Sequence, residues 1–192
     1  YVIADWATGS KNAENDHFTA NEITEDRGIN FNFTKDNAGF NDGMVSPFVY
    51  FDGDFTFSWE YKATSAAGGE PRMIVEMRTL ISYDHNSCGG IQFGAQYNSD
   101  ATLNRYLLSG AGLAEGYKWN EPGAGTDATD GSRFTITRKI HDDYAEITLT
   151  ATSLTDPTKT FTRTINVGAT ADKSTDNATA FSGWNRVVIL QW

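Results

Sequence analysis

Two glutamates stand in the middle of strand-like segments, where a pair of carboxylates could cleave a sugar polymer. Glu60 and Glu76 are the candidates, with Glu146 as a third strand carboxylate. Hydrolysis of a glycosidic bond needs two carboxylates about 5 to 9 Å apart, one as general acid and one as nucleophile or base. The three glutamates would suit this chemistry if they shared one sheet face. Glutamates close to Lys62 and Arg78 also form cross-strand ion pairs on solvated faces, and this alternative is favoured.

A second set of residues could hold a sugar without cleaving it. Tyr117, Trp119 and Asn120 occur together in a glycine-rich polar stretch, and Gln92 and Gln96 alternate along a strand-like segment. Aromatic faces pack against the C–H groups of sugar rings, and planar polar side chains fix the hydroxyls by hydrogen bonds. These residues are the predicted ligand-binding set. The alternative for Trp119 is that it only anchors its own loop.

Aspartate-rich turns could hold a metal ion. Asp52 and Asp54 flank a glycine, and Asp127 and Asp130 fall in another short polar stretch. Calcium takes several carboxylate, amide and carbonyl oxygens, so such turns predict a structural Ca²⁺. The alternative is ordinary turn chemistry, in which aspartate accepts hydrogen bonds from nearby backbone N–H groups. The three histidines are too scattered to indicate a zinc site.

The elements that would position these groups are strands, because apolar residues recur at every second position. In the segment from Asp54 to Lys62, for example, four aromatic residues alternate with polar ones. The same alternation predicts further strands at Arg72 to Thr79, Gly90 to Tyr97, Arg133 to Ile140, Tyr144 to Thr152 and Lys159 to Val167.

Shorter strands are expected at Val2 to Trp6, Gly28 to Thr34, Val45 to Phe51, Asn104 to Leu108 and Trp184 to Trp192, with long loops at Ala7 to Asp16 and Ser109 to Gly131. No segment has a capped helical period, and no linker divides residues 1–192. A sheet this large must cover its apolar face with another sheet. The sequence thus predicts one all-β domain, a two-sheet antiparallel β-sandwich.

Charge and cysteine content limit the possible partners. The 192 residues carry a net charge of -10, which would repel nucleic acid and an anionic membrane surface, and no apolar run is long enough to span a bilayer. Glycans and divalent cations remain compatible partners. A single cysteine, Cys88, excludes an internal disulfide. The first residue is not Met, which suggests a mature chain whose targeting segment was removed or a domain cut from a larger protein, and a secreted or surface-held protein is expected.

Two segments resemble the concanavalin A-like lectin and glucanase superfamily, whose members are jelly rolls. They are VSPFVYFDGDFTFSWEYKA from Val45 to Ala63, and the hairpin RFTITRKI with DYAEITLTATSL from Arg133 to Leu154. The resemblance implies two curved antiparallel sheets with a concave face, a fold that hosts lectins, carbohydrate-binding modules, hydrolases, lyases and structural domains. The Glu-x-Asp-x-x-Glu strand of its hydrolases is absent here. Met77 to Leu80 and Gly90 to Phe93 echo the alginate-lyase strands only faintly.

Three functions remain open at this point. The leading one is a non-catalytic module or lectin that binds a polysaccharide or other glycan. The second is a structural subunit of an extracellular filament or surface layer, which would associate with its own kind through edge strands. Its support is the threonine-rich segment from Lys159 to Val167 and an N-terminal strand at Tyr1 to Trp6 that could be donated to a neighbour's sheet. The third is a polysaccharide hydrolase or lyase that uses Glu60 and Glu76.

Overall fold

A computed structural model describes the chain at residues 7–9, 18–24, 28–33, 42–45, 53–62, 72–78, 90–98, 100, 102–109, 130–168 and 186–191. Every element in these ranges is a β-strand, and every strand pairing is antiparallel. The all-β prediction is confirmed for the part of the chain that is described. Among the same residues, no helix is present that could cross a membrane.

The larger sheet has six strands in the order β1-β4-β12-β6-β7-β8. Its strands are β1 (Ala7–Gly9), β4 (Asp42–Val45), β12 (Arg186–Gln191), β6 (Arg72–Arg78), β7 (Gly90–Tyr97) and β8 (Leu103–Ser109). A separate two-stranded sheet pairs β2 (Phe18–Thr24) with β3 (Gly28–Phe33).

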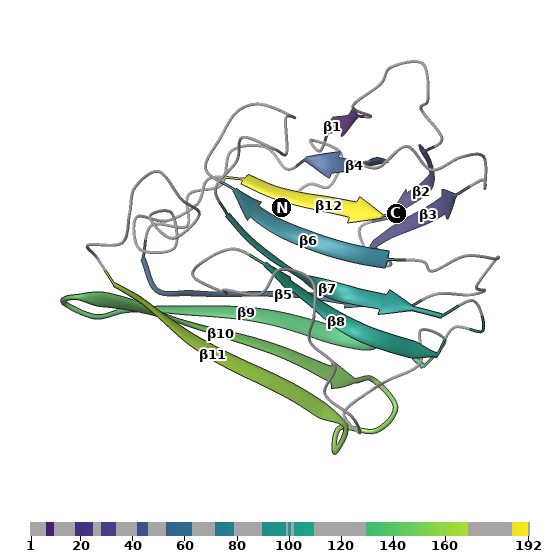
Figure 1. Ribbon diagram of the computed structural model, residues 1–192. Helices are drawn as coiled ribbons and strands as arrows, with labels where there is room; N and C mark the ends of the chain where they lie inside the picture. The colour runs from purple at the N-terminus through teal and green to yellow at the C-terminus, as the bar shows by residue number, and fades with distance from the viewer. Residues whose placement is uncertain are drawn as a thin grey trace.

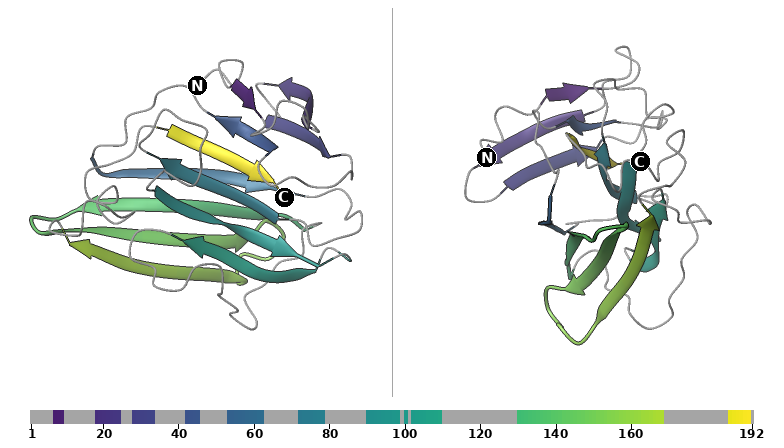
Figure 2. Two further views of the ribbon diagram at one scale, coloured as in Figure 1. Left: turned by 45° about the horizontal axis from the view of Figure 1, so that its top comes forward. Right: turned by 90° about the vertical axis from the view of Figure 1, so that its left-hand side faces the viewer.

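The smaller of the two main sheets has four strands in the order β11-β10-β9-β5. They are β11 (Thr160–Gly168), β10 (Tyr144–Ser153), β9 (Ser132–Ile140) and β5 (Phe55–Tyr61). Figure 1 shows β9, β10 and β11 side by side in green, with β6 and β12 of the larger sheet drawn above them. Figure 2 turns the same layers to two further views.

The strands with clear alternation form within one residue of their predicted bounds, namely β5, β6, β7, β9, β10 and β11. Alternation is a strong signal in these segments because one face of each strand is apolar. The burial of β10 follows it at every position, with each half-buried residue followed by a buried one.

The weaker predictions need correction near the N-terminus. The sequence predicts a loop from Ala7 to Asp16, but Ala7–Gly9 forms β1, a strand too short to show a period. It predicts no strand at Phe18–Thr24, where a register shift between Ala20 and Glu22 interrupts the alternation of β2. It places a strand from Val45 to Phe51; Val45 belongs to β4 (Asp42–Val45), and residues 46–51 lie outside the described residues. The predicted strand from Val2 to Trp6 lies outside the described residues.

Side chains from both main sheets meet in one hydrophobic core. Phe93 of β7 has no exposed surface, and its ring centroid lies 5.4 Å from that of Phe134 on β9 and 6.0 Å from that of Trp59 on β5. Tyr106 of β8 stacks on Phe161 of β11 at 4.5 Å. Burial raises the pKa of Tyr106 to about 12. The aromatic stripe predicted for β5 packs against this core, as expected.

Gly131 directly precedes β9 and lies beside the residue that follows β10, at the open end of the β9 and β10 hairpin. Its φ is 81°, a region that favours glycine, and its carbonyl accepts a hydrogen bond from the N–H of Leu154. A Cβ added here would lie 2.9 Å from the side chain of Leu154 and 3.3 Å from the carbonyl oxygen of Tyr61. Gly53 is the matched contrast, because a Cβ there meets nothing within 4 Å.

We expect Gly131→Ala to lower the free energy of unfolding by about 1 to 3 kcal/mol, through backbone strain and the close contact with Leu154. Gly53→Ala should change it by less than about 1 kcal/mol, with stabilisation the favoured sign. Urea unfolding of both variants measures the difference. Equal midpoints for the two variants would contradict this account of Gly131.

Candidate functional site

The candidate site is the face of the six-stranded sheet that points away from the core. Along β7, Ile91, Phe93, Ala95 and Tyr97 are buried in the core, so Gln92 and Gln96 belong to the opposite face. This division of β7 is the one that the sequence predicts. Gln92 is half-buried, while Gln96 has no exposed surface.

The ladder brings polar residues of the neighbouring strands into line with these two amides. Gln92 pairs in register with Glu76 of β6 and with Ser109 of β8. Gln96 pairs with Arg72 and Arg105 of the same two strands. Residues opposite one another in a ladder lie on the same face of a sheet.

We call these two sets of three residues the amide rows: Glu76, Gln92 and Ser109, and Arg72, Gln96 and Arg105. By residue type the rows contain amides, a carboxylate, a hydroxyl and guanidinium groups, which are classes of side chain that recognise hydroxyl-rich ligands in proteins. The predicted site residues Gln92, Gln96 and Glu76 are therefore brought together on one face, although they come from two strands.

Burial assigns different parts to the two glutamines. Gln96 has no exposed surface, so a ligand in solvent would not reach its amide group. Gln92 keeps partial exposure. Tyr117, Trp119 and Asn120, the other predicted ligand-binding residues, lie outside the described residues, and their role stays a prediction.

The two candidate catalytic glutamates are not on one face. Glu60 lies on the outer face of the four-stranded sheet, whereas Glu76 lies on β6 of the six-stranded sheet between two core residues, Val75 and Met77. The core separates the faces to which they belong. The possibility that Glu60 and Glu76 share a sheet face is therefore not realised, because the two segments enter different sheets.

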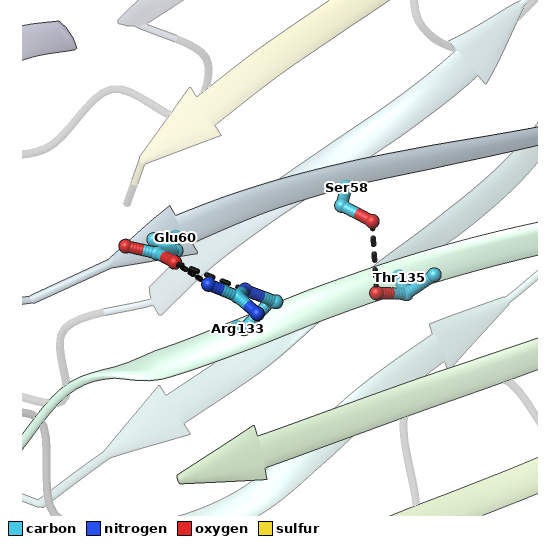
Figure 3. Close-up of polar contacts among 4 residues, drawn as sticks. All are labelled: Ser58, Glu60, Arg133 and Thr135. Carbon is cyan, nitrogen blue, oxygen red and sulfur yellow. Dashed lines mark hydrogen bonds and ion pairs between the residues drawn. The ribbon is translucent and has the colours of Figure 1, made fainter. Parts of the chain in front are cut away.

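Glu60 is instead half of a surface ion pair. It lies directly opposite Arg133 in the β5 and β9 ladder, and both Nε (2.9 Å) and Nη2 of Arg133 donate to Oε1 of Glu60 (Figure 3). Both side chains are about half exposed. The sequence favours a cross-strand ion pair for this carboxylate, and the structure supplies its partner. An exposed pair of this kind contributes about 0 to 1 kcal/mol to stability.

Of the four aspartates predicted to bind calcium, two lie within the described residues. Asp54 is exposed, and its Oδ1 accepts a hydrogen bond from the N–H of Ile140 at 2.7 Å, which ties the start of β5 to the end of β9. Asp130 is a half-buried turn residue, and Asp52 and Asp127 lie outside the described residues. In the part of the chain that is described, no group of three or more His, Cys, Asp or Glu side chains could hold a metal ion. The calcium site stays a prediction.

One buried arginine was not predicted from the sequence. Arg138 falls on the apolar face of β9 with Phe134 and Ile136, has no exposed surface, and donates from Nη1 to the carbonyl of Gly53 at 3.0 Å. Its parity along the strand is the available signal, since every second residue from Phe134 faces the core.

No protein-family profile, curated protein or solved structure matches this chain.

Proposed function

We propose that this protein is a two-sheet, jelly-roll β-sandwich that binds a polysaccharide or other glycan without cleaving it, as a secreted or surface-held module. The observation that carries the proposal is the alignment of the amide rows on the non-core face of the six-stranded sheet. The contacts of Phe93 and Tyr106 with rings of the four-stranded sheet support the sandwich architecture.

The chemistry of the amide rows fits a sugar polymer better than other ligands. Amides and carboxylates each bond two hydroxyls in a fixed plane, and guanidinium groups extend the range to acidic sugars. The net charge of -10 disfavours nucleic acid as the occupant. In this proposal Tyr117, Trp119 and Asn120 supply the stacking surface, and a structural Ca²⁺ in the aspartate turns stabilises the loops.

A non-catalytic role is favoured because the two candidate catalytic glutamates belong to different sheets. Glu60 is held by Arg133 at the surface, and Glu76 belongs to the other sheet. A lyase or hydrolase would have to use Glu76 with a partner other than Glu60.

Affinity electrophoresis and calorimetry with soluble neutral and acidic polysaccharides test the proposal. We expect Gln92→Ala to weaken binding by about three- to tenfold, the effect of one hydrogen bond lost to a hydroxyl. Trp119→Ala should abolish stacking and change the melting temperature little. Glu60→Gln is the matched control, since it lies on the other sheet and should bind as the wild type does.

Absence of binding to every polysaccharide would overturn the proposal. Equal loss of affinity in Gln92→Ala and Glu60→Gln would show that the glycan does not bind at the amide rows. If Trp119→Ala unfolds the protein, that loop belongs to the core and the stacking surface is elsewhere.

One observation supports the structural alternative, a subunit of an extracellular filament or surface layer. β11 is nine residues long, lies at the edge of its sheet, and pairs only with β10 among the described strands. Its outward residues Thr160, Thr162, Thr164 and Asn166 carry no charge that would oppose pairing with another strand. Sedimentation velocity at high concentration, with and without Ca²⁺, tests this: a strict monomer contradicts it.

A further inference from the structure

The outer face of the four-stranded sheet carries a two-dimensional array of hydroxyl side chains. In each of two adjacent rows across β5, β9, β10 and β11, the ladder aligns four residues that are all serine or threonine. We call these eight residues the hydroxyl grid: Ser58, Thr135, Thr150 and Thr162 in one row, and Thr56, Thr137, Thr148 and Thr164 in the other.

Hydroxyl groups of neighbouring strands contact one another within the rows. The oxygens of Ser58 and Thr135 are 3.0 Å apart (Figure 3), and those of Thr148 and Thr164 are 3.1 Å apart. Each hydroxyl has one hydrogen to donate and two lone pairs, so such a pair keeps capacity for further bonds. The grid therefore presents oriented hydroxyls to the solvent.

Three features hold the grid rigid. The ladders joining the four strands run without a register shift. Threonine is stiff at χ1, which fixes both its hydroxyl and its methyl group. The grid residues of the outer strands β5 and β11 are exposed, whereas those of the central strands β9 and β10 are half-buried. The central side chains are therefore packed between their neighbours.

The grid is neutral in an acidic protein. Charged residues make up 21% of the chain, yet none occupies the eight positions. They appear in the next row on each side: Glu60 pairs with Arg133 beyond one end, and Lys139 lies opposite Glu146 beyond the other. The grid is thus a bounded patch of hydroxyls and methyls.

The chemistry of the grid excludes several occupants. It offers no cation for phosphates and no aromatic face for sugar rings. Serine and threonine are also under-represented among the residues that dominate protein interfaces. A surface of fixed hydroxyls and methyls is suited to water that is itself held in a regular array.

We propose that the hydroxyl grid binds the surface of ice. Neighbouring strands are about 4.8 Å apart, and alternate residues along a strand are about 6.7 Å apart, so the hydroxyls repeat in two directions. Water molecules recur at comparable intervals in the surface layers of hexagonal ice. Waters bonded to the grid would take up this repeat and join the crystal.

The twist of the sheet limits the area over which the grid can match an ice surface, and so limits the strength of ice binding. Adjacent strands rotate by about 20 to 25°, so the match extends over neighbouring strands and not over a large plane. The expected activity is therefore inhibition of ice recrystallisation, with little depression of the freezing point. The hydroxyl grid lies on the four-stranded sheet and the amide rows on the six-stranded sheet, so ice binding does not depend on glycan binding.

The test compares ice grain growth in frozen solutions of the full chain, of variants, and of an inert protein at equal concentration. Thr135→Val with Thr150→Val removes two central hydroxyls and keeps the side-chain shape. We expect it to raise the half-inhibitory concentration by about tenfold or more. Thr155→Val, in the exposed turn after β10, is the matched control and should inhibit as the wild type does.

Thermal unfolding shows whether the central double variant is folded. If it is not, Thr162→Val with Thr164→Val at the exposed edge strand replaces it. Grain growth in wild-type solution equal to that with the inert protein overturns the proposal, and so does a folded double variant that inhibits fully. If the double variant changes only the sedimentation coefficient, the grid is a contact between copies of this chain, and the proposal is overturned.

Discussion

Phe93→Ala is expected to lower the free energy of unfolding by about 3 to 5 kcal/mol, a large share of the roughly 5 to 15 kcal/mol that stabilises an ordinary domain. Phe93 has no exposed surface and belongs to the six-stranded sheet, yet its ring contacts Trp59, Phe134 and Phe161 of the four-stranded sheet. Truncation would leave a cavity between the sheets, where neighbouring rings cannot collapse without moving a strand. Urea unfolding followed by tryptophan fluorescence measures the loss.

Leu154→Ala is the control for Phe93→Ala, since Leu154 is 40% exposed and should lose less than about 1 kcal/mol. Trp59→Ala should fall near the lower end of the range for Phe93, about 3 kcal/mol. Trp59 stacks on Phe134 at 5.5 Å but is only half-buried. An effect of Phe93→Ala no larger than that of Leu154→Ala would show that the core is not centred between these sheets.

The second large effect is expected at Arg138. Arg138→Ala should lower the free energy of unfolding by about 3 to 5 kcal/mol, because it removes a fully buried side chain and leaves the Gly53 carbonyl without this donor. Arg138→Met keeps most of the volume and loses only the polar contacts, so about 1 to 3 kcal/mol is expected.

The comparison of the two Arg138 variants by urea unfolding separates volume from hydrogen bonding. If Met is as destabilising as Ala, hydrogen bonds of the guanidinium dominate and the cavity contributes little. A loss of less than about 1 kcal/mol for Ala would contradict a structural role for this buried cation.

Local alternation accounts for the part of the fold that could be predicted. In β10, Ala145, Ile147, Leu149 and Ala151 occupy every second position and are all buried. A period of two is a property of the strand itself, so it is visible without knowledge of any neighbour. β2 escaped prediction because a register shift breaks its period, and β1 because it has only three residues.

Register between strands could not be predicted, and it decides both proposed sites. The sequence places Gln92 and Gln96 on one face of β7, but it does not reveal that Glu76 and Arg72 lie opposite them. The threonine row of β11 is likewise visible, whereas its alignment with Thr148 and Thr150 of β10 depends on which residues the turn leaves paired. The burial of Arg138 was not predicted because its charge interrupts the otherwise apolar face of β9.

The strand order of the four-stranded sheet also implies an order of assembly. β9, β10 and β11 follow one another along the chain, and the side-chain contacts between β10 and β11 join residues only 8 to 16 positions apart. The side-chain contacts between β5 and β9 join residues 73 to 81 positions apart. Hairpins close in microseconds, whereas non-local pairings must first overcome the entropy of a long loop.

The meander of residues 130–168 is therefore the part of the sheet that can form first, and the docking of β5 on β9 is a later and slower event. Changes in the turns of the meander would then alter the rate of folding. Changes in β5, Trp59 among them, would act mainly on the rate of unfolding and so on the lifetime of the native state.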